Sequence, residues 1–292
     1  MPKKKQNLIL GKPLIPNAGI AAWYKAQLKG LVRYMTDKVS RKVLKLYKEI
    51  PNAVNYAQDD DSLSSQERIL LNALADEIEK LFKRKAAEIA DRMINRQEKY
   101  AKFSVKQSIG SLGEAFTLAA GASKTLNTWE RLASVQEIIK AVRMENINLI
   151  QNLSSEYLTQ IKGAVARSII NGQGQTFLKQ EIAKFGGMTL RRAARIAKDQ
   201  THKAYNALSY NAMAESGIEY WQWVHGGGTK TVRETHIKEH DKGGLNHGVF
   251  KIGQKAYDPQ AEKVKGVYRG KYIEPGELPF CSCIRRPVFK FD

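Results

Sequence analysis

The chain has 292 residues, of which 42% are hydrophobic and 26% are charged, so it can form one large or two modest folded domains. No apolar run approaches the roughly 18 residues that a membrane span requires. The lysines after Met1 resemble the start of a signal peptide, but no apolar segment of adequate length follows, and secretion is not expected. The two cysteines are separated by one residue and form no disulfide framework, which favours a reducing compartment.

Positive charge dominates the composition and is concentrated near the amino terminus. The formal net charge is +19, and the first 50 residues contain 12 lysines and arginines against 2 acids. Such a surplus favours a polyanionic partner, most often nucleic acid, because cationic side chains neutralise phosphates and release counterions. A solvated basic surface, or one that docks onto an acidic protein, is the alternative explanation.

Residues 1–16 are polar and basic and contain Pro13 and Pro16, so they are predicted to form a flexible arm. Asn17 is a suitable N-cap for a long amphipathic helix that ends before Pro51. Its apolar residues recur at steps of three or four, which leaves most of its lysines and arginines on other faces. Such a helix can lie on DNA or on a membrane, or it can pack its apolar stripe against neighbouring helices.

A capping box opens the second predicted helix. Ser64 and Glu67 are three residues apart, the spacing at which each side chain bonds the other's backbone N–H. An apolar stripe then continues over residues 69–93 and weakens near Tyr100, and glycines loosen the pattern over residues 101–127.

Three further helices are expected downstream. They cover residues 128–149, residues 154–172 and residues 176–185, and the last of them stops at the Gly186-Gly187 pair. The region from residue 17 to 188 is therefore predicted to be a helical scaffold and docking region.

Residues 189–292 are predicted to form a separate α+β domain. Thr189 is a suitable cap for a helix that ends at Gly217, because glycine tolerates the left-handed conformation at a helix end. Residues 218–224 are rich in aromatic and β-branched side chains, as is typical of a buried strand. Residues 249–252 form a second short strand, and a polar basic loop follows. The expected fold is thus mainly α, with long amino-terminal helices and a small α+β carboxy-terminal domain.

All five histidines and both cysteines lie in this predicted domain. If the chain forms a helical turn there, His236 and His240 lie four residues apart on one face, a usual spacing for two ligands of one metal. With Cys281 and Cys283 they would complete a tetrahedral structural zinc site. Cys-x-Cys is a less usual spacing than that of zinc knuckles, so two buried thiols and two surface histidines are the alternative. His247 could replace His240 as a ligand.

Candidate DNA contacts lie on the helix after Thr189 and in the amino-terminal arm. Cationic side chains three or four apart on one helical face could form a ridge toward phosphates, although a solvated helix face fits as well. The candidates are Arg191, Arg192, Arg195 and Lys198 on the helix, and Lys3, Lys4 and Lys5 in the arm. No recognised motif for reading bases is present, so contact with double-stranded DNA is expected to be non-specific.

Three blocks of sequence carry a family likeness. They are Lys12-Pro-Leu-Ile-Pro-Asn, the helix Arg192-Ala-Ala-Arg-Ile-Ala-Lys-Asp-Gln-Thr-His-Lys-Ala, and Val232-Arg-Glu-Thr-His followed by Cys281-Ser-Cys. Together they resemble the Mu protein-F-like minor head, or head-morphogenesis, proteins of tailed bacteriophages. Some members of that family carry Cys-x-x-Cys where this chain has Arg233-Glu-Thr-His236, which favours His236 as a metal ligand.

The resemblance implies a structural protein that is present in few copies in the phage head. It implies association with the portal or the major capsid protein, in the virion and, during assembly, in the host cytoplasm. Some members of the family bind DNA. The resemblance implies no enzyme activity, and no residue is predicted to be catalytic.

A metal-dependent nuclease of the His-Asn-His class is the enzymatic alternative. It would use His240-Asp241 and Asn246-His247, with a histidine that polarises water near a metal bound to phosphate. The spacing is too short for the usual metal unit, and Gly243-Gly244 suggests a turn. A general nucleic-acid-binding accessory protein is the third hypothesis, which the charge supports equally well.

Overall fold

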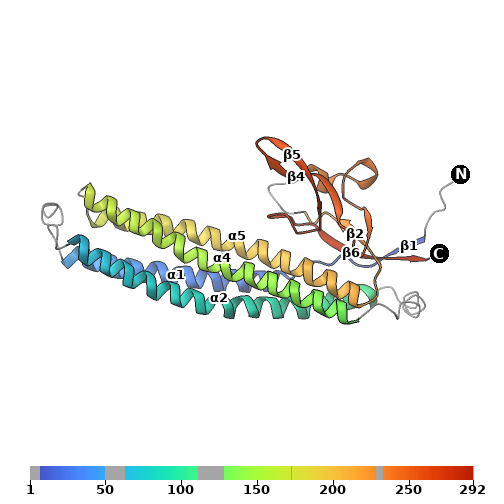
Figure 1. Ribbon diagram of the computed structural model, residues 1–292, viewed down its shortest axis with the longest axis horizontal. Helices are drawn as coiled ribbons and strands as arrows, with labels where there is room; N and C mark the ends of the chain where they lie inside the picture. The colour runs from blue at the N-terminus through green and yellow to red at the C-terminus, as the bar shows by residue number, and fades with distance from the viewer. Residues whose placement is uncertain (1–6, 50–62, 111–127, 172, 228–232, 292) are drawn as a thin grey trace. The chain divides into compact units, whose positions relative to one another are not determined.

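The structure, a computed structural model, describes residues 7–49, 63–110, 128–171, 173–227 and 233–291. Four long helices dominate these residues (Figure 1): α1 (Ala18–Glu49), α2 (Leu63–Gly110), α4 (Thr128–Ile170) and α5 (Gln175–Glu215). Two short helices are α6 (Glu234–Ile237) and η2 (His240–Lys242). The strands are β1 (Asn7–Leu10), β2 (Tyr220–Val224), β3 (Val249–Lys251), β4 (Ala256–Val264), β5 (Val267–Ile273) and β6 (Ile284–Phe291). The predicted class, mainly α with a small α+β carboxy-terminal part, is confirmed.

Two predicted helix boundaries are confirmed in atomic detail. The side chain of Asn17 accepts a hydrogen bond of 3.1 Å from the backbone N–H of Ile20, as an N-cap does. Gly217 has a φ of 74°, and the N–H of Ile218 donates to the carbonyl of Met213 at 3.1 Å, which closes α5. Local chemistry therefore sets both boundaries.

The breaks predicted inside the helical region are wrong. α2 continues to Gly110 without the predicted weakening, and α4 is continuous across residues 149–154. α5 is continuous through Gly186-Gly187. Thr189 lies inside α5, where its hydroxyl donates to the carbonyl of Phe185 at 2.9 Å instead of capping a new helix.

Gly186 lies inside α5 at a point where the side chain of Thr36 on α1 comes too close for a larger residue. A Cβ added at Gly186 would lie 2.8 Å from the side-chain methyl of Thr36 on α1. The glycine thus permits close helix packing rather than ending a helix, since a small residue lets two helix backbones approach. A sequence pattern does not separate these two roles of glycine.

The chain forms two compact units whose segments alternate along the sequence. Unit 1 comprises residues 1–20, 93–142 and 199–292, and unit 2 comprises residues 21–92 and 143–198. Each long helix contributes residues to both units. The predicted boundary between residues 188 and 189 lies inside α5, which is continuous from Gln175 to Glu215.

Unit 2 is a group of helical segments with an apolar core. The residues that α1 buries there recur at steps of three or four: Tyr24, Leu28, Val32, Met35, Val39 and Val43. The hydroxyl of Tyr24 donates to the side-chain oxygen of Asn146 at 2.7 Å, so both buried polar groups are satisfied. The apolar stripe of α1 is therefore packed against neighbouring helices. No helix among the described residues is both long enough and apolar enough to span a bilayer.

A four-stranded antiparallel sheet lies in unit 1, in the order β1-β6-β2-β3. β2 confirms the predicted buried strand, and its Trp221 and Trp223 have 0% exposed surface. β1 pairs Asn7 with Phe291, so residues 7–10 are not part of a flexible arm as predicted. Pairing between opposite ends of the chain leaves no local signal in the sequence.

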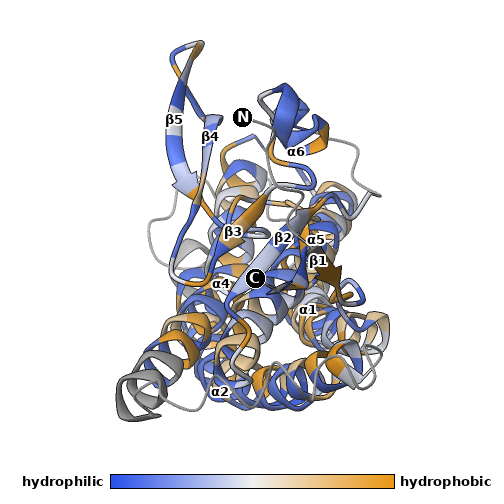
Figure 2. Ribbon diagram, turned by 90° about the vertical axis from the view of Figure 1, so that its right-hand side faces the viewer, coloured by the Kyte–Doolittle hydropathy of each residue, from blue (hydrophilic) through white to orange (hydrophobic). Residues whose placement is uncertain are grey.

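β4 and β5 form a second sheet of two strands where a polar loop was predicted. The first six residues of β5 are exposed, so the strand lacks the apolar alternation that marks a half-buried strand. Lys265 and Gly266 connect the strands with φ of 49° and 85°, and positive φ at both positions is typical of the tightest hairpin turns. Figure 2 shows that this hairpin is mostly hydrophilic.

A buried guanidinium joins β6 to α5 and to the segment before β6. Arg285 has 0% exposed surface, and it donates to the carbonyl of Asn206 at 2.8 Å and to the carboxylate of Glu274 at 2.7 Å. It also stacks over the rings of Tyr210 and Trp221. Burial lowers the pKa of Arg285, an effect that the charge of Glu274 opposes.

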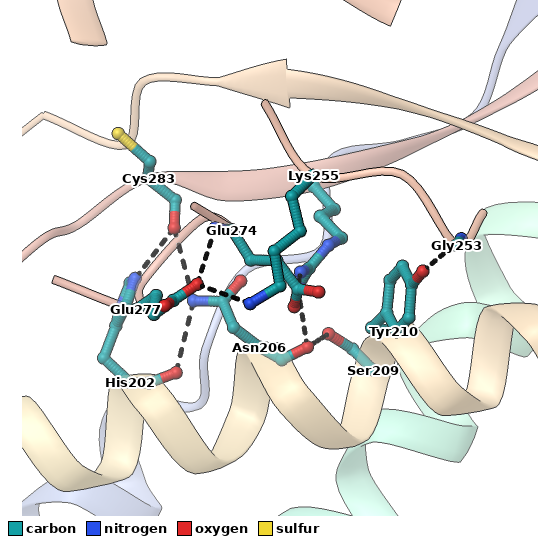
Figure 3. Close-up of polar contacts among 10 residues, drawn as sticks. His202, Asn206, Ser209, Tyr210, Gly253, Lys255, Glu274, Glu277 and Cys283 are labelled. Carbon is teal, nitrogen blue, oxygen red and sulfur yellow. Dashed lines mark hydrogen bonds and ion pairs between the residues drawn. The ribbon is translucent and has the colours of Figure 1, made fainter. Parts of the chain in front are cut away.

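The same stretch of α5 holds the backbone just before β6 (Figure 3). The carbonyl of Cys283 accepts a hydrogen bond from the side-chain amide of Asn206 at 3.2 Å, and it lies 3.1 Å from Nε2 of His202. α5 therefore fixes the position of the second cysteine through its main chain, which leaves the thiol free to face elsewhere.

Replacing Arg285 by methionine is expected to lower the free energy of unfolding by about 3 kcal/mol, because Glu274 and the carbonyl of Asn206 lose their donor. Denaturant unfolding followed by tryptophan fluorescence measures this change. Arg33→Met, at an exposed position on α1, is the matched control and should change stability by no more than about 0.5 kcal/mol. Equal unfolding midpoints for Arg285→Met and the wild type would contradict the structural role of Arg285.

Candidate metal centre

Three predicted metal ligands come together in the interior of unit 1. His236, Cys281 and Cys283 place one nitrogen and two sulfurs within 4.8 Å of one another. Nδ1 of His236 lies 3.5 Å from the sulfur of each cysteine. The exposed fractions of the three residues are 2%, 7% and 1%. The group is therefore directed at a common centre that is sealed from solvent.

Close backbone contacts position the two cysteines. A Cβ added at Gly226 would lie 2.0 Å from the carbonyl oxygen of Ser282, so only glycine allows this approach of the chain after β2. Phe280 has a φ of 58°, and its N–H donates to the carboxylate of Asp199 at 2.6 Å. A non-glycine residue in the left-handed region is strained, and the hydrogen bond to Asp199 helps to offset that strain. This conformation of Phe280 turns the chain just before the buried Cys281.

The short helix α6 places His236, and Asp258 on β4 orients its ring. Nε2 of His236 lies 3.0 Å from a carboxylate oxygen of Asp258, which has 0% exposed surface. This contact leaves Nδ1 turned toward the sulfurs. A carboxylate behind a histidine is the usual support of a metal-bound imidazole, since it fixes both the tautomer and the ring orientation.

Electrostatics within the cluster favour a thiolate. A hydrogen bond from Cys283, together with the adjacent His236, lowers the pKa of Cys281 to about 4, although burial opposes the shift. The interaction with Cys281, reinforced by burial, raises the pKa of Cys283. Burial alone would lower the pKa of His236, but its hydrogen bonds to Asp258 and Cys281 outweigh burial and raise it. Because thiolates are the form of cysteine that binds metals, the site has the chemistry of a metal centre.

His225 is a neighbour of the cluster that was not among the predicted ligands. It directly follows β2, and its Nδ1 lies 3.6 Å from the sulfur of Cys283. Its backbone N–H donates to the side-chain oxygen of Asn246 at 3.0 Å, which anchors the main chain at this point. His225 is therefore an additional nitrogen donor beside Cys283.

The structure does not bring His240 or His247 into the cluster. Lys238 has an extended backbone that ends α6, so His236 and His240 do not share one helical face. Nδ1 of His240 lies 3.1 Å from the carbonyl of Gly244, and its ring packs edge-on against Phe250. His247 is exposed.

The predicted DNA contacts on α5 lie on the surface of unit 2. Arg191, Arg195 and Lys198 are exposed, and Arg192 is half-buried in an ion pair with Glu156. Arg191, Arg192, Arg195 and Glu156 line a pocket of about 210 Å³. The predicted contacts Lys3, Lys4 and Lys5 lie outside the described residues.

Comparison with known proteins agrees with the resemblance seen in the sequence. Residues 159–285 match the family described as Phage Mu protein F like protein. This segment is therefore similar to that family. The Mu protein F-like segment contains all three members of the cluster and the supporting Asp258, so the match covers the whole candidate metal centre.

A relative is similar over nearly the whole chain. An uncharacterized protein of Haemophilus influenzae is 26% identical over 278 residues, which cover 95% of this chain and 55% of that protein. The chain thus spans about half the length of this relative. No solved structure matches the chain.

The close approach at Gly226 can be tested by substitution. Gly226→Ala is expected to lower the free energy of unfolding by about 2 kcal/mol or more, because the new methyl meets the carbonyl of Ser282 and displaces the cysteine turn. Gly30→Ala is the matched control, since a Cβ at Gly30 meets nothing within 4 Å and alanine stabilises a helix interior by up to about 1 kcal/mol. Thermal unfolding measures both variants, and a Gly226→Ala protein as stable as the wild type would contradict the contact.

Proposed function

We propose that the protein is a structural minor head protein of a tailed bacteriophage that acts in head morphogenesis. It docks on the portal or the major capsid protein, assembles in the host cytoplasm and remains in the virion. The observation that carries this proposal is the family match over residues 159–285, which confirms the likeness seen in the sequence. The helical segments of unit 2 supply a long, rigid surface for docking.

The nuclease alternative lacks an assembled site among the described residues. Neither His240 nor His247 belongs to a group of metal-ligating side chains there. Nδ1 of His247 lies 2.9 Å from a carboxylate oxygen of Glu239, and the amide of Asn246 donates to the same carboxylate at 3.2 Å. These side chains hold their own loop together, and the loop has the features of a structural turn.

Co-assembly tests the head-protein proposal. The protein, produced with the portal and major capsid proteins of its phage, is expected to co-sediment with portal rings or procapsids. The association should persist at raised salt, since a purely electrostatic adsorption is screened there. Free protein in a gradient that contains assembled procapsids would contradict the proposal. Cleavage of plasmid DNA by the purified protein with Mg²⁺, Mn²⁺ or Zn²⁺ would support the nuclease instead.

We further propose that the cluster holds a structural zinc ion. With the usual Zn–S and Zn–N bond lengths, tetrahedral geometry separates a sulfur from a nitrogen ligand by about 3.5 Å. The separations from His236 to Cys281 and Cys283 are both 3.5 Å, and that from His225 to Cys283 is 3.6 Å. His225, which lies beside Cys283 but outside the group of His236, Cys281 and Cys283, takes the place of the predicted His240 as the candidate fourth ligand in this proposal. Bound zinc would cross-link these segments and stabilise the fold.

Metal analysis of the purified full chain is expected to give about one zinc ion per chain. Cys281→Ser combined with Cys283→Ser should lose the metal and unfold more readily, and Asp258→Asn should weaken zinc binding by about 10- to 100-fold. His225→Ala should weaken binding, whereas His240→Ala is the control that should retain zinc. The site would be contradicted if the wild type contained no zinc above background. It would also be contradicted if the double cysteine variant were as stable as the wild type.

Contact with packaged DNA is also part of the proposal. The positive charge of +19 supports it, as do the exposed Arg191, Arg195 and Lys198 on α5. Arg192 is the weakest of the four candidates on α5, because Glu156 already neutralises its charge. Such contacts would address phosphates and therefore carry no sequence preference.

A further inference from the structure

Apart from Asp258 at its base, the hairpin of β4 and β5, residues 256–273, has no role in the function proposed so far. Its strands pair with each other in a separate sheet, and neither pairs with a further strand among the described residues. Figures 1 and 2 show the hairpin extending away from the four-stranded sheet of unit 1. It is an exposed two-stranded ribbon, the shape that fits the major groove of B-form DNA.

One face of the ribbon carries tyrosines. Tyr257 pairs with Tyr272 across the strands, with ring centroids 5.2 Å apart, and Tyr268 alternates onto the same face of β5. Gly270 lies between them, and a Cβ there would lie 2.0 Å from the hydroxyl of Tyr257, so that ring covers the glycine. The three tyrosines are 53%, 63% and 53% exposed in the order named. Exposed aromatic hydroxyls at fixed spacing suit contacts to a phosphate backbone.

The ribbon also carries a surplus of positive charge. Lys263, Lys265, Arg269 and Lys271 are exposed, against a single exposed acid, Glu262. Lys263 lies over the ring of Tyr268 at 5.0 Å from its centroid. Lys271 is 3.8 Å from Glu277, whereas the other three cations form no ion pair with any described residue. A protein partner would need several acidic side chains to match this surface, whereas a phosphate backbone carries negative charges at regular intervals.

The base of the ribbon is rigid. Ala256 and Ile273 are fully buried and opposite each other at the point where the ribbon leaves the core. Asp258 is buried beside them and contacts His236 of the candidate metal centre. This anchoring restrains the ribbon at its base, which reduces the entropy lost on binding.

We propose that the β4–β5 ribbon binds double-stranded DNA through phosphate contacts from Lys263 and Lys265 near its tyrosine face and from Arg269 on the opposite face. The proposal rests on the DNA contact included in the proposed function, and it names the element that makes this contact. Binding is independent of base sequence, because the ribbon presents cations and hydroxyls rather than a set of paired donors and acceptors for base edges.

The test is titration of the full chain with duplex DNA of mixed sequence at several salt concentrations. In the variant Lys263→Gln, Lys265→Gln, Arg269→Gln, the slope of log affinity against log salt is expected to become shallower by about 0.9 for each phosphate that is no longer neutralised. A matched variant removes the same charge from exposed positions of α2. Its changes are Lys80→Gln, Lys83→Gln and Lys99→Gln. This control should keep the wild-type slope, and unchanged thermal unfolding should show that both variants are folded.

The outcomes separate this inference from the proposed function. If both variants lose affinity equally, the protein binds DNA through its overall charge and the ribbon site is refuted. If the wild type binds no DNA, the DNA contact in the proposed function fails, and the ribbon site with it. If the ribbon variant keeps its DNA affinity but no longer co-sediments with procapsids, the ribbon is a protein-docking surface and the inference is overturned.

Discussion

The pairing of β6 on both of its edges is the constraint on which unit 1 depends. β6 binds β1 on one side and β2 on the other, so one strand joins the amino-terminal strand to the tryptophan strand. It begins at Ile284, directly after Cys283, and Arg285 anchors it to α5. The register of this strand therefore fixes the positions of the cysteines. A shift by one residue would turn Arg285 out of the core and move the thiols away from His236.

In our proposal the cluster is a structural metal site that links separate segments of the chain, and it is not a catalytic centre. Its members come from α6 and from the turn before β6, and our proposal adds His225, which directly follows β2. These segments lie far apart in the sequence, so a metal that links them would add to the stability of the unit. A catalytic zinc needs an open position for water or substrate. The burial of all three members of the cluster favours a structural role for the proposed zinc instead.

The sequence predicted what depends on neighbours along the chain and missed what depends on distant contacts. The long helices, the cap at Asn17 and the terminating Gly217 follow from local periodicity and backbone preference. Gly186 misled the prediction because its role is set by Thr36 on another helix. β1, β4, β5 and β6 were missed, because β4 and β5 are polar and β1 and β6 pair with each other from opposite ends of the chain. In the site, residue type pointed to His236 and the cysteines, whereas no spacing rule could have indicated His225 or Asp258.

Asp258 connects the interior of unit 1 to its surface, because it supports His236 from the base of the exposed ribbon. Its carboxylate also accepts the N–H of Gln260 at 2.9 Å, beside the irregularity in the pairing of β4 with β5. The same side chain thus shapes the strand and orients a member of the cluster. Zinc bound by the cluster, as we propose, would therefore restrain the base of the ribbon through the contact between His236 and Asp258. If the ribbon binds DNA as we propose, the cluster would contribute to binding as well as to folding, because a restrained ribbon loses less conformational entropy on binding than a flexible one.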